Sequence, residues 1–168
     1  GNATDRVLTL DGTGDMVVSG VIANGSTSTV SGITKAGSGT LTLDGNNTYG
    51  GTTTLTAGTI EVGHNNALGT GTLSLNGGTL RGDGTARTLA NNIILAADSV
   101  IAGLSALNFD GTFGDISADR TLTVNNSATT TFDDINISNS ATDRTLTFAG
   151  TGNTTVNGVI SNGSTSTA

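Results

Sequence analysis

Hydrophobic and polar residues alternate in short runs along the whole chain. Six runs place apolar side chains two positions apart, at 7–10, 40–43, 59–62, 72–75, 121–124 and 145–148. A period of two puts these side chains on one face of a β-strand. No window shows a sustained apolar period of 3.6 with helix caps, so the pattern predicts an all-β chain.

Turn signals separate the predicted strands. Asn-Gly or Gly-Gly pairs occur at 24–25, 50–51, 76–78, 157–158 and 162–163, and such pairs mark tight turns. Short strands with tight turns are compatible with two architectures. One is an antiparallel β-sandwich of hairpins, and the other is a β-solenoid whose coils stack on one another.

The beginning of the chain recurs near its end. Residues 2–30 and 140–168 are identical at 19 of 29 aligned positions. We therefore interpret 1–168 as one solenoid segment, with 1–138 as a full repeat and 139–168 as the start of the next. Repeat arrays bury apolar surface by stacking neighbours, so both ends are expected to be interfaces.

Internal phrases favour the solenoid over the sandwich. The sequence Asp-Arg-Thr-Leu-Thr at 119–123 returns at 143–147, a spacing of about one coil of a β-helix. At roughly 20–24 residues and ~4.8 Å per coil, the chain would form about seven coils. Leu, Ile, Val and the four phenylalanines are expected to fill the core: Phe109, Phe113, Phe132 and Phe148.

The composition agrees with stacked strands and excludes some functions. The chain has 26 Gly, 33 Thr and 17 Asn, and it has no Pro, Cys or Trp. Absence of Pro suits coils in which nearly every N–H is a ladder donor. The net charge of −7 with scattered Lys and Arg argues against a nucleic-acid partner. No apolar run is long enough for a membrane-spanning helix, so no membrane insertion by this segment is expected.

Three phrases in the first half carry a family resemblance. Residues 34–43 read TKAGSGTLTL, residues 47–53 read NTYGGTT and residues 58–62 read GTIEV. In this order they resemble the autotransporter-associated β-strand repeat, also called the passenger-associated transport repeat. The resemblance extends over residues 33–80. Residues 81–139 do not match the pattern.

The resemblance implies a right-handed parallel β-helix in a large bacterial protein exported by type V secretion. It implies an extracellular or cell-surface location and a structural role as a stalk or filament. An adhesin that binds glycans or host proteins through repeated loops is the alternative. The expected partners are neighbouring repeats of the same chain, or other copies joined end to end. The family has no shared catalytic or cofactor-binding residues.

Candidate catalytic residues are few, and we expect no enzyme activity and no cofactor. His64 is the only histidine, and no Gly-x-Ser-x-Gly elbow or cysteine accompanies it for a catalytic triad or a zinc site. Glycoside hydrolysis needs two carboxylates. The available pairs are Asp133 with Asp134, Asp110 with Asp115, and Asp11 with Asp15. The chain has one Tyr and no Trp to line a sugar cleft.

Two acidic turns are candidate calcium sites. Residues 11–15 and 110–115 place carboxylates around Gly turns, but neither has a recognised calcium-loop pattern. Ala149 and Asn153 replace the two carboxylates in the second copy of the first turn. We therefore expect solvated turns and no metal.

Two exposed loops remain as candidate ligand sites. Arg81, Gly82 and Asp83 form the integrin-recognition tripeptide beside a predicted strand end. The hexapeptide Asn-Gly-Ser-Thr-Ser-Thr occurs at 24–29 and again at 162–167. Each is expected to be a solvated loop, and repetition would give avidity if either binds a ligand weakly.

Overall fold

Parallel β-strands form the framework of the protein. The computed structural model describes residues 5–28, 30–114, 116–137 and 143–162. The first sheet contains β1 (Val7–Leu10), β3 (Gly32–Lys35), β5 (Thr53–Leu55), β7 (Leu73–Asn76), β10 (Ile93–Ala97), β13 (Phe113–Gly114), β16 (Ile135–Asn136) and β19 (Ile160–Ser161). The second contains β2 (Met16–Val18), β4 (Thr40–Leu43), β6 (Thr59–Val62), β8 (Thr79–Gly82), β11 (Ser99–Gly103), β14 (Arg120–Asn126) and β17 (Leu146–Ala149). The third contains β9 (Arg87–Leu89), β12 (Leu107–Phe109), β15 (Thr130–Phe132) and β18 (Thr154–Val156).

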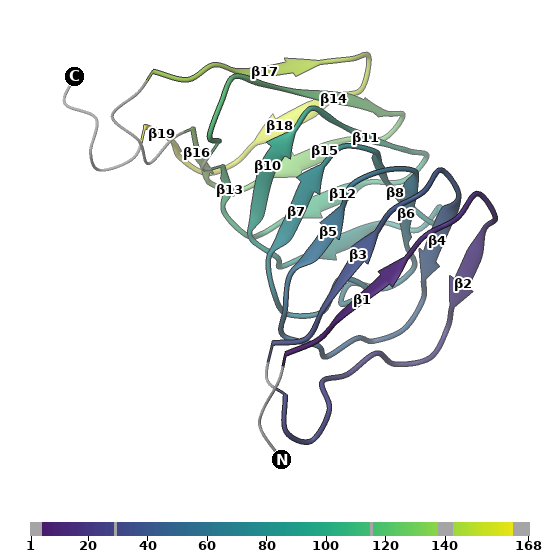
Figure 1. Cartoon of the computed structure of the whole chain (residues 1–168). Coiled ribbons are helices and arrows are strands. Elements are labelled where there is room, and N and C mark those ends of the chain that lie inside the picture. The colour runs from purple at the N-terminus through teal and green to yellow at the C-terminus, as the bar shows by residue number, and fades with distance from the viewer. Residues whose placement is uncertain (1–4, 29, 115, 138–142, 163–168) are drawn as a thin grey trace.

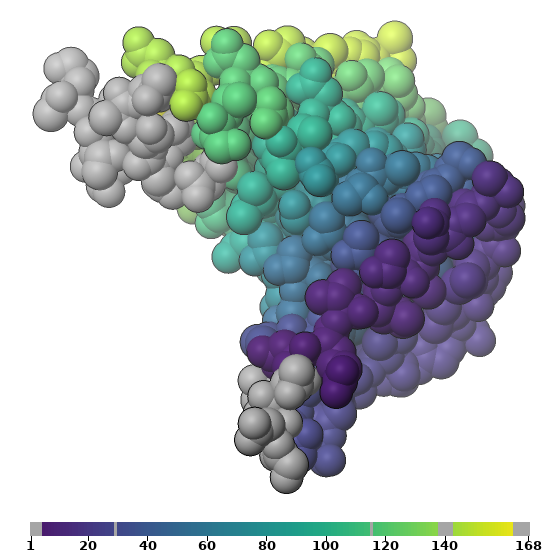
Figure 2. Space-filling view, in the orientation of Figure 1, coloured from purple at the N-terminus to yellow at the C-terminus, as the bar shows by residue number. Residues whose placement is uncertain are grey.

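The three sheets form the sides of a β-solenoid of about seven coils (Figure 1). Each strand pairs in parallel with the strand of the same side in the next coil, as β3 does with β5 and β4 with β6. The predicted solenoid is therefore confirmed, and the antiparallel sandwich is excluded. In the space-filling view, successive coils form neighbouring bands from purple to yellow (Figure 2).

Coil length is regular in the middle of the chain and greater towards both ends. In the first sheet, Ile33 pairs with Thr53 and Thr53 with Leu73, whereas the last coil runs from Ile135 to its partner Ile160. The phrase that recurs at 119–123 and 143–147 is therefore not a guide to register, because it gives too short a coil.

The actual register of β14 and β17 differs from the one that this phrase suggests. The phrase would place Thr121 opposite Thr145, but Thr121 pairs with Thr147. A shift by an even number of positions leaves the inward face of a strand unchanged. The predicted alternation of inward and outward residues therefore agrees with the observed register.

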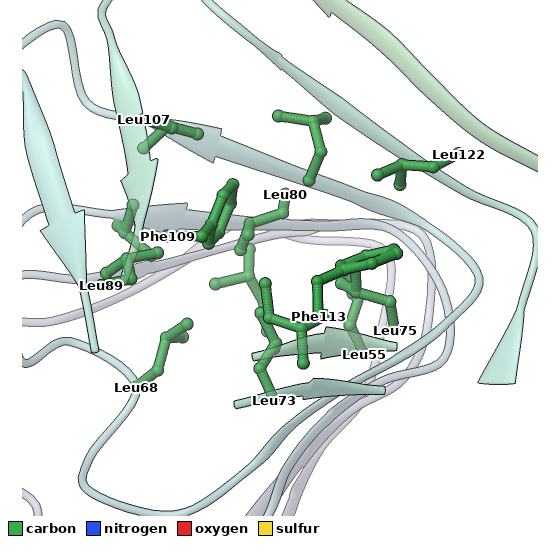
Figure 3. Close-up of a cluster of buried hydrophobic side chains, with 14 of the residues drawn as sticks. Leu55, Leu68, Leu73, Leu75, Leu80, Leu89, Leu107, Phe109, Phe113 and Leu122 are labelled. Carbon is green, nitrogen blue, oxygen red and sulfur yellow. The ribbon is translucent and has the colours of Figure 1, made fainter. Parts of the chain in front are cut away.

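The core is a column of inward side chains between the three sheets. Leu41 and Leu43 alternate with Thr40 and Thr42 in β4, and both leucines are fully buried. Figure 3 shows Leu55, Leu73, Leu80 and Phe109 pointing into this column from different sides.

Three of the four predicted core phenylalanines are buried: Phe109, Phe113 and Phe132. Phe148 packs near them but remains 37% exposed, because β17 is the last described strand of its sheet. The aromatic part of the core thus lies towards the C-terminal end of the described solenoid, and Phe148 at its edge is only partly covered.

Glycines set the corner between the first and second sheets. Gly37, Gly58 and Gly78 occupy this corner in successive coils with φ of +69°, +67° and +67°. This left-handed conformation is favourable for Gly and costly for residues with a side chain. A Cβ at Gly58 would also lie 2.5 Å from the carbonyl oxygen of Gly37. The Gly positions of the motif thus allow coils to turn and stack closely.

Candidate functional site

An open groove beside the second sheet contains the tripeptide Arg81, Gly82 and Asp83. Its volume is about 400 Å³, and Glu61 and Leu104 also line it. Leu104 is 81% exposed. The groove forms because the glycines of its lining carry no side chain, while Arg81 at the end of β8 points outward to Glu61.

Arg81 is paired with the coil before it. Glu61 and Arg81 occupy opposite positions in β6 and β8, and Arg81 Nε lies 2.8 Å from Glu61 Oε2. Glu61 Oε1 also accepts a hydrogen bond from Thr42 Oγ1 at 3.3 Å. The Arg81 side chain is thus held in a polar row that crosses three coils.

Asp83 is paired within its own loop. Arg87 Nη2 lies 2.6 Å from Asp83 Oδ2, and Arg87 Nε donates to Asp83 Oδ1 at 3.2 Å. The backbone N–H of Thr85 donates to the same Oδ1. The hydrogen bonds from Arg87 lower the pKa of Asp83 against the opposing effect of burial. Both charged groups of the tripeptide therefore have partners inside the chain.

His64 is placed away from the acidic turns. It is half-buried in a turn, where its Nδ1 accepts the N–H of Asn66 at 2.9 Å. The imidazole thus closes its own turn. Among the hydrogen bonds of the described residues, none joins His64 to a carboxylate.

Two of the candidate carboxylates bond the backbone of the next coil. Asp134 Oδ1 accepts the N–H of Val159 at 2.8 Å, and Asp15 Oδ1 accepts that of Thr40 at 2.7 Å. Asp11 Oδ1 accepts the N–H of Gly12 within its own turn. These carboxylates therefore have a structural use as acceptors at the corners of the coils.

The remaining acidic candidates lie on the surface or outside the described residues. Asp110 and Asp133 follow the paired strands β12 and β15 and are exposed. Asp115 lies outside the described residues, as does the second polar hexapeptide apart from Asn162. In the first hexapeptide, residues 24–28 are described and include a turn in which Ser28 N–H donates to the carbonyl oxygen of Gly25.

No metal centre is found in the described part of the chain. Its His, Asp and Glu side chains form no group of three or more that could hold an ion. Asp11 and Asp15 instead interact electrostatically with Lys35. The charges of these two carboxylates thus act on a cationic side chain of the next coil.

Lys35 is a buried amine that the alternation pattern does not single out. Its side chain lies on the inward face of β3 with only 4% exposure, and its Nζ donates to the carbonyl oxygens of Ala36 and Gly37 at 2.5 and 2.9 Å. Burial lowers the pKa of Lys35, and the charges of Asp11 and Asp15 oppose this shift. Lys35 therefore satisfies the carbonyls of a glycine turn. The sequence signal for its burial is its position in β3, because it stands two residues after Ile33 where the alternation places an inward side chain.

Asn47 and Tyr49 of the motif are also buried. Asn47 Oδ1 accepts the N–H of Ile22, and its Nδ2 donates to the carbonyl of Ala67, so it connects three successive coils. Tyr49 Oη lies 2.6 Å from Thr53 Oγ1. Burial raises the pKa of Tyr49 to about 12. The polar side chains of the motif thus bond the protein itself.

Other asparagine side chains also connect coils. Asn66 Nδ2 donates to Asn46 Oδ1 at 2.8 Å, one coil away. Asn91 Nδ2 donates to the carbonyls of Gly69 and Gly71. Stacked amides of this kind reinforce the backbone ladders along the solenoid axis.

Comparison with known proteins identifies one part of the chain. No curated protein and no solved structure matches it. Among the described residues, no helix is long and apolar enough to span a membrane. The family model of the passenger-associated transport repeat matches residues 33–62, which run from β3 to the end of β6 and include Lys35, Asn47 and Tyr49. The resemblance of the motif is thereby confirmed, and this repeat and the β-solenoid fold fit a repeat segment of an autotransporter passenger.

Proposed function

We propose that this chain is a structural repeat segment of a large, secreted bacterial surface protein, where it forms part of a stiff stalk or filament. The observation that carries the proposal is the use of the polar motif residues. Lys35, Asn47 and Tyr49 are buried and bond neighbouring backbone or side chains. A ligand-binding role would need such groups to face solvent or a cavity.

Stacked coils make a suitable material for a stalk. The backbone hydrogen bonds between coils run along the axis, so bending requires many of them to change together. Each coil adds ~4.8 Å of length, and a repeat of six to seven coils therefore adds about 30 Å. Thr residues on the outward faces and the net charge of −7 favour solubility of such an extended surface.

Neighbouring repeats are the proposed partners of the end coils. Leu8 and Met16 in the first coil are 47% and 41% exposed, and Ile160 in the last is 60% exposed, although their partners in the next or preceding coil are buried. Coils of adjoining repeats, or of another copy joined end to end, would cover these side chains and pair the open strand edges. This explains apolar side chains at positions where the middle coils have buried ones.

An adhesin that acts through its loops is the second candidate. The observation in its favour is the groove with Arg81, Asp83 and the exposed Leu104. A glycan or host protein that binds there would compete with the pairs Arg81–Glu61 and Asp83–Arg87. The stalk remains the preferred function because these pairs already satisfy the charges. We propose no catalytic role for the groove.

Immunogold electron microscopy of intact source cells tests the proposal. An antibody raised against residues 1–168 is applied, with a strain that lacks the gene as control. Gold particles spaced along extended fibres are expected. Label confined to the envelope without fibres would overturn the stalk and favour the adhesin. A glycan array and cell-binding assays with the purified chain would then follow.

A further inference from the structure

Two copies of one sequence phrase lie on different sides of the solenoid. Residues 7–18 and 145–156 are equivalent in the alignment of the two copies. The first copy forms β1 and β2, which belong to the first and second sheets. The second copy forms β17 and β18, which belong to the second and third sheets. Relative to the strands of the first copy, both strands of the second copy therefore lie one side further round the solenoid.

The register gives the number of coils in one repeat. Starting at Leu8, the paired residues of the first sheet are Ile33, Thr53, Leu73, Ile93, Phe113 and Ile135. This path contains six coils. Leu146, the equivalent of Leu8, follows Ile135 beyond the next corner and lies in the second sheet. One repeat therefore contains six coils and one further side.

Coil length explains why the repeat does not close on the same side. The coils between Ile33 and Phe113 are short. Seven coils of this length would use roughly as much chain as one repeat, and they would return each copy to its starting side. The coils from Leu8 to Ile33 and from Phe113 to Ile135 are longer than these. In the first coil, the longer path includes the turn closed by Ser28 N–H and the Gly25 carbonyl.

We infer that, in a tandem array of this repeat, the second sheet of each copy continues as the first sheet of the next. Each copy is then rotated by one side, and any surface residue returns to the same side only in every third copy. At ~4.8 Å per coil, that return takes about 90 Å along the axis. In three successive copies, the groove with Arg81 and Asp83 therefore faces three different sides of the array. The inference rests on the proposed function in taking the chain as a unit of an array.

The same register identifies what covers the open edge of β1. Within this chain, β14 pairs with β17, and Leu122 lies opposite Phe148. Because Phe148 is equivalent to Leu10, β14 of the preceding copy occupies the open edge of β1 and places its Leu122 against Leu10. This pairing covers Leu8, which is 47% exposed in the single segment. The occupant of this edge is a second copy of the same repeat.

Cysteine cross-linking in a two-copy protein tests the inference. Residues 1–138 are followed directly by residues 1–168, and the natural sequence contains no Cys. One variant combines Thr121→Cys in copy one with Thr9→Cys in copy two, since Thr121 pairs with Thr147, the equivalent of Thr9. A second variant combines Thr9→Cys with Thr34→Cys in copy two and reports the first sheet. Strand neighbours lie within disulfide range, and both links are expected to form on mild oxidation.

A third variant tests the alternative register and combines Ser127→Cys in copy one with Thr9→Cys in copy two. These two positions would be neighbours if this coil were as short as the middle coils. A link at Ser127 in place of Thr121 would overturn the inference, as would absence of both expected links in a protein that melts like its parent. Reduced variants are first checked by circular dichroism for unchanged melting. Disulfide formation is measured in purified protein, so its result is independent of the immunogold experiment that tests the proposed function.

Discussion

Phe109 lies face to face with Phe132 of the next coil, with ring centroids 5.1 Å apart and ring planes 11° apart. The two residues are directly paired in β12 and β15. Phe113 approaches Phe132 from the first sheet with its ring inclined by 62° at the same centroid distance. Side chains of successive coils and of different sides thus interlock in one column.

Removing the central ring of this cluster should destabilise the protein strongly. Phe132→Ala creates a cavity between coils, and Phe→Ala changes in cores cost about 3–5 kcal/mol. Thr131→Ala in the same strand faces outward and should change the free energy of unfolding by about 0.5 kcal/mol or less. Urea unfolding followed by circular dichroism measures both. Equal effects of the two changes would contradict the inward assignment of Phe132.

Tyr49 should make the protein sensitive to alkaline pH. Burial raises its pKa to about 12 in the folded protein from an ordinary value of 10.0, so the unfolded chain loses the proton first. The stabilisation is complete below pH 10 and is lost as the pH rises through the folded-state pKa. About 3 kcal/mol is expected to disappear over this window. Unfolding midpoints in urea across this pH range provide the measurement.

Tyr49→Phe is the control for this pH dependence. It removes the hydrogen bond to Thr53 and lowers stability at neutral pH, but it has no proton to lose. Lys35 acts in the opposite direction, because its pKa is lowered by burial and its stability contribution rises with pH. Comparing parent and Tyr49→Phe isolates the tyrosine. A parallel decline of the two proteins above pH 10 would refute its role.

Lys35 should stabilise the glycine turn that follows β3. Lys35→Met keeps most of the buried chain length but leaves the carbonyls of Ala36 and Gly37 without the ammonium donor. Loss of a partner for buried polar groups costs about 1–3 kcal/mol. Thr34→Ala, which faces outward in the same strand, is the matched control. If Lys35→Met melts at or above the temperature of the parent protein, the proposed capping role is wrong.

The Arg-Gly-Asp tripeptide should not support cell adhesion. Glu61 holds Arg81 and Arg87 holds Asp83, so neither charge is available without breaking a pair. Asp83→Glu, which disrupts integrin recognition, is therefore expected to leave adhesion of integrin-bearing cells to immobilised protein unchanged. Arg87→Ala releases Asp83 and serves as a comparison. A clear drop in cell adhesion for Asp83→Glu would contradict this prediction and would support residues 81–83 as a ligand-binding loop.

The sequence predicts the fold through its alternation and its repeats, and it predicts inward residues such as Leu43 correctly. It does not predict that Lys35 in β3 and Asn47 between β4 and β5 are buried, because polar residues of strands and connecting segments normally face solvent. The partners of Asn47 lie in neighbouring coils, whereas Lys35 bonds the carbonyls of the turn that directly follows it. The sequence leaves the register of β14 with β17 open. Thr121 pairs with Thr147 and not with the residue that the repeated phrase suggests, because this coil is longer than the spacing of the phrase.

The length of purified tandem arrays tests the central claim most directly. Proteins with two, four and eight copies of residues 1–138 are imaged by electron microscopy. The stacked-coil account predicts rods of constant width whose length grows by about 30 Å for each copy, from ~4.8 Å per coil. Compact particles that widen as copies are added would contradict a continuous solenoid and a stalk built from it.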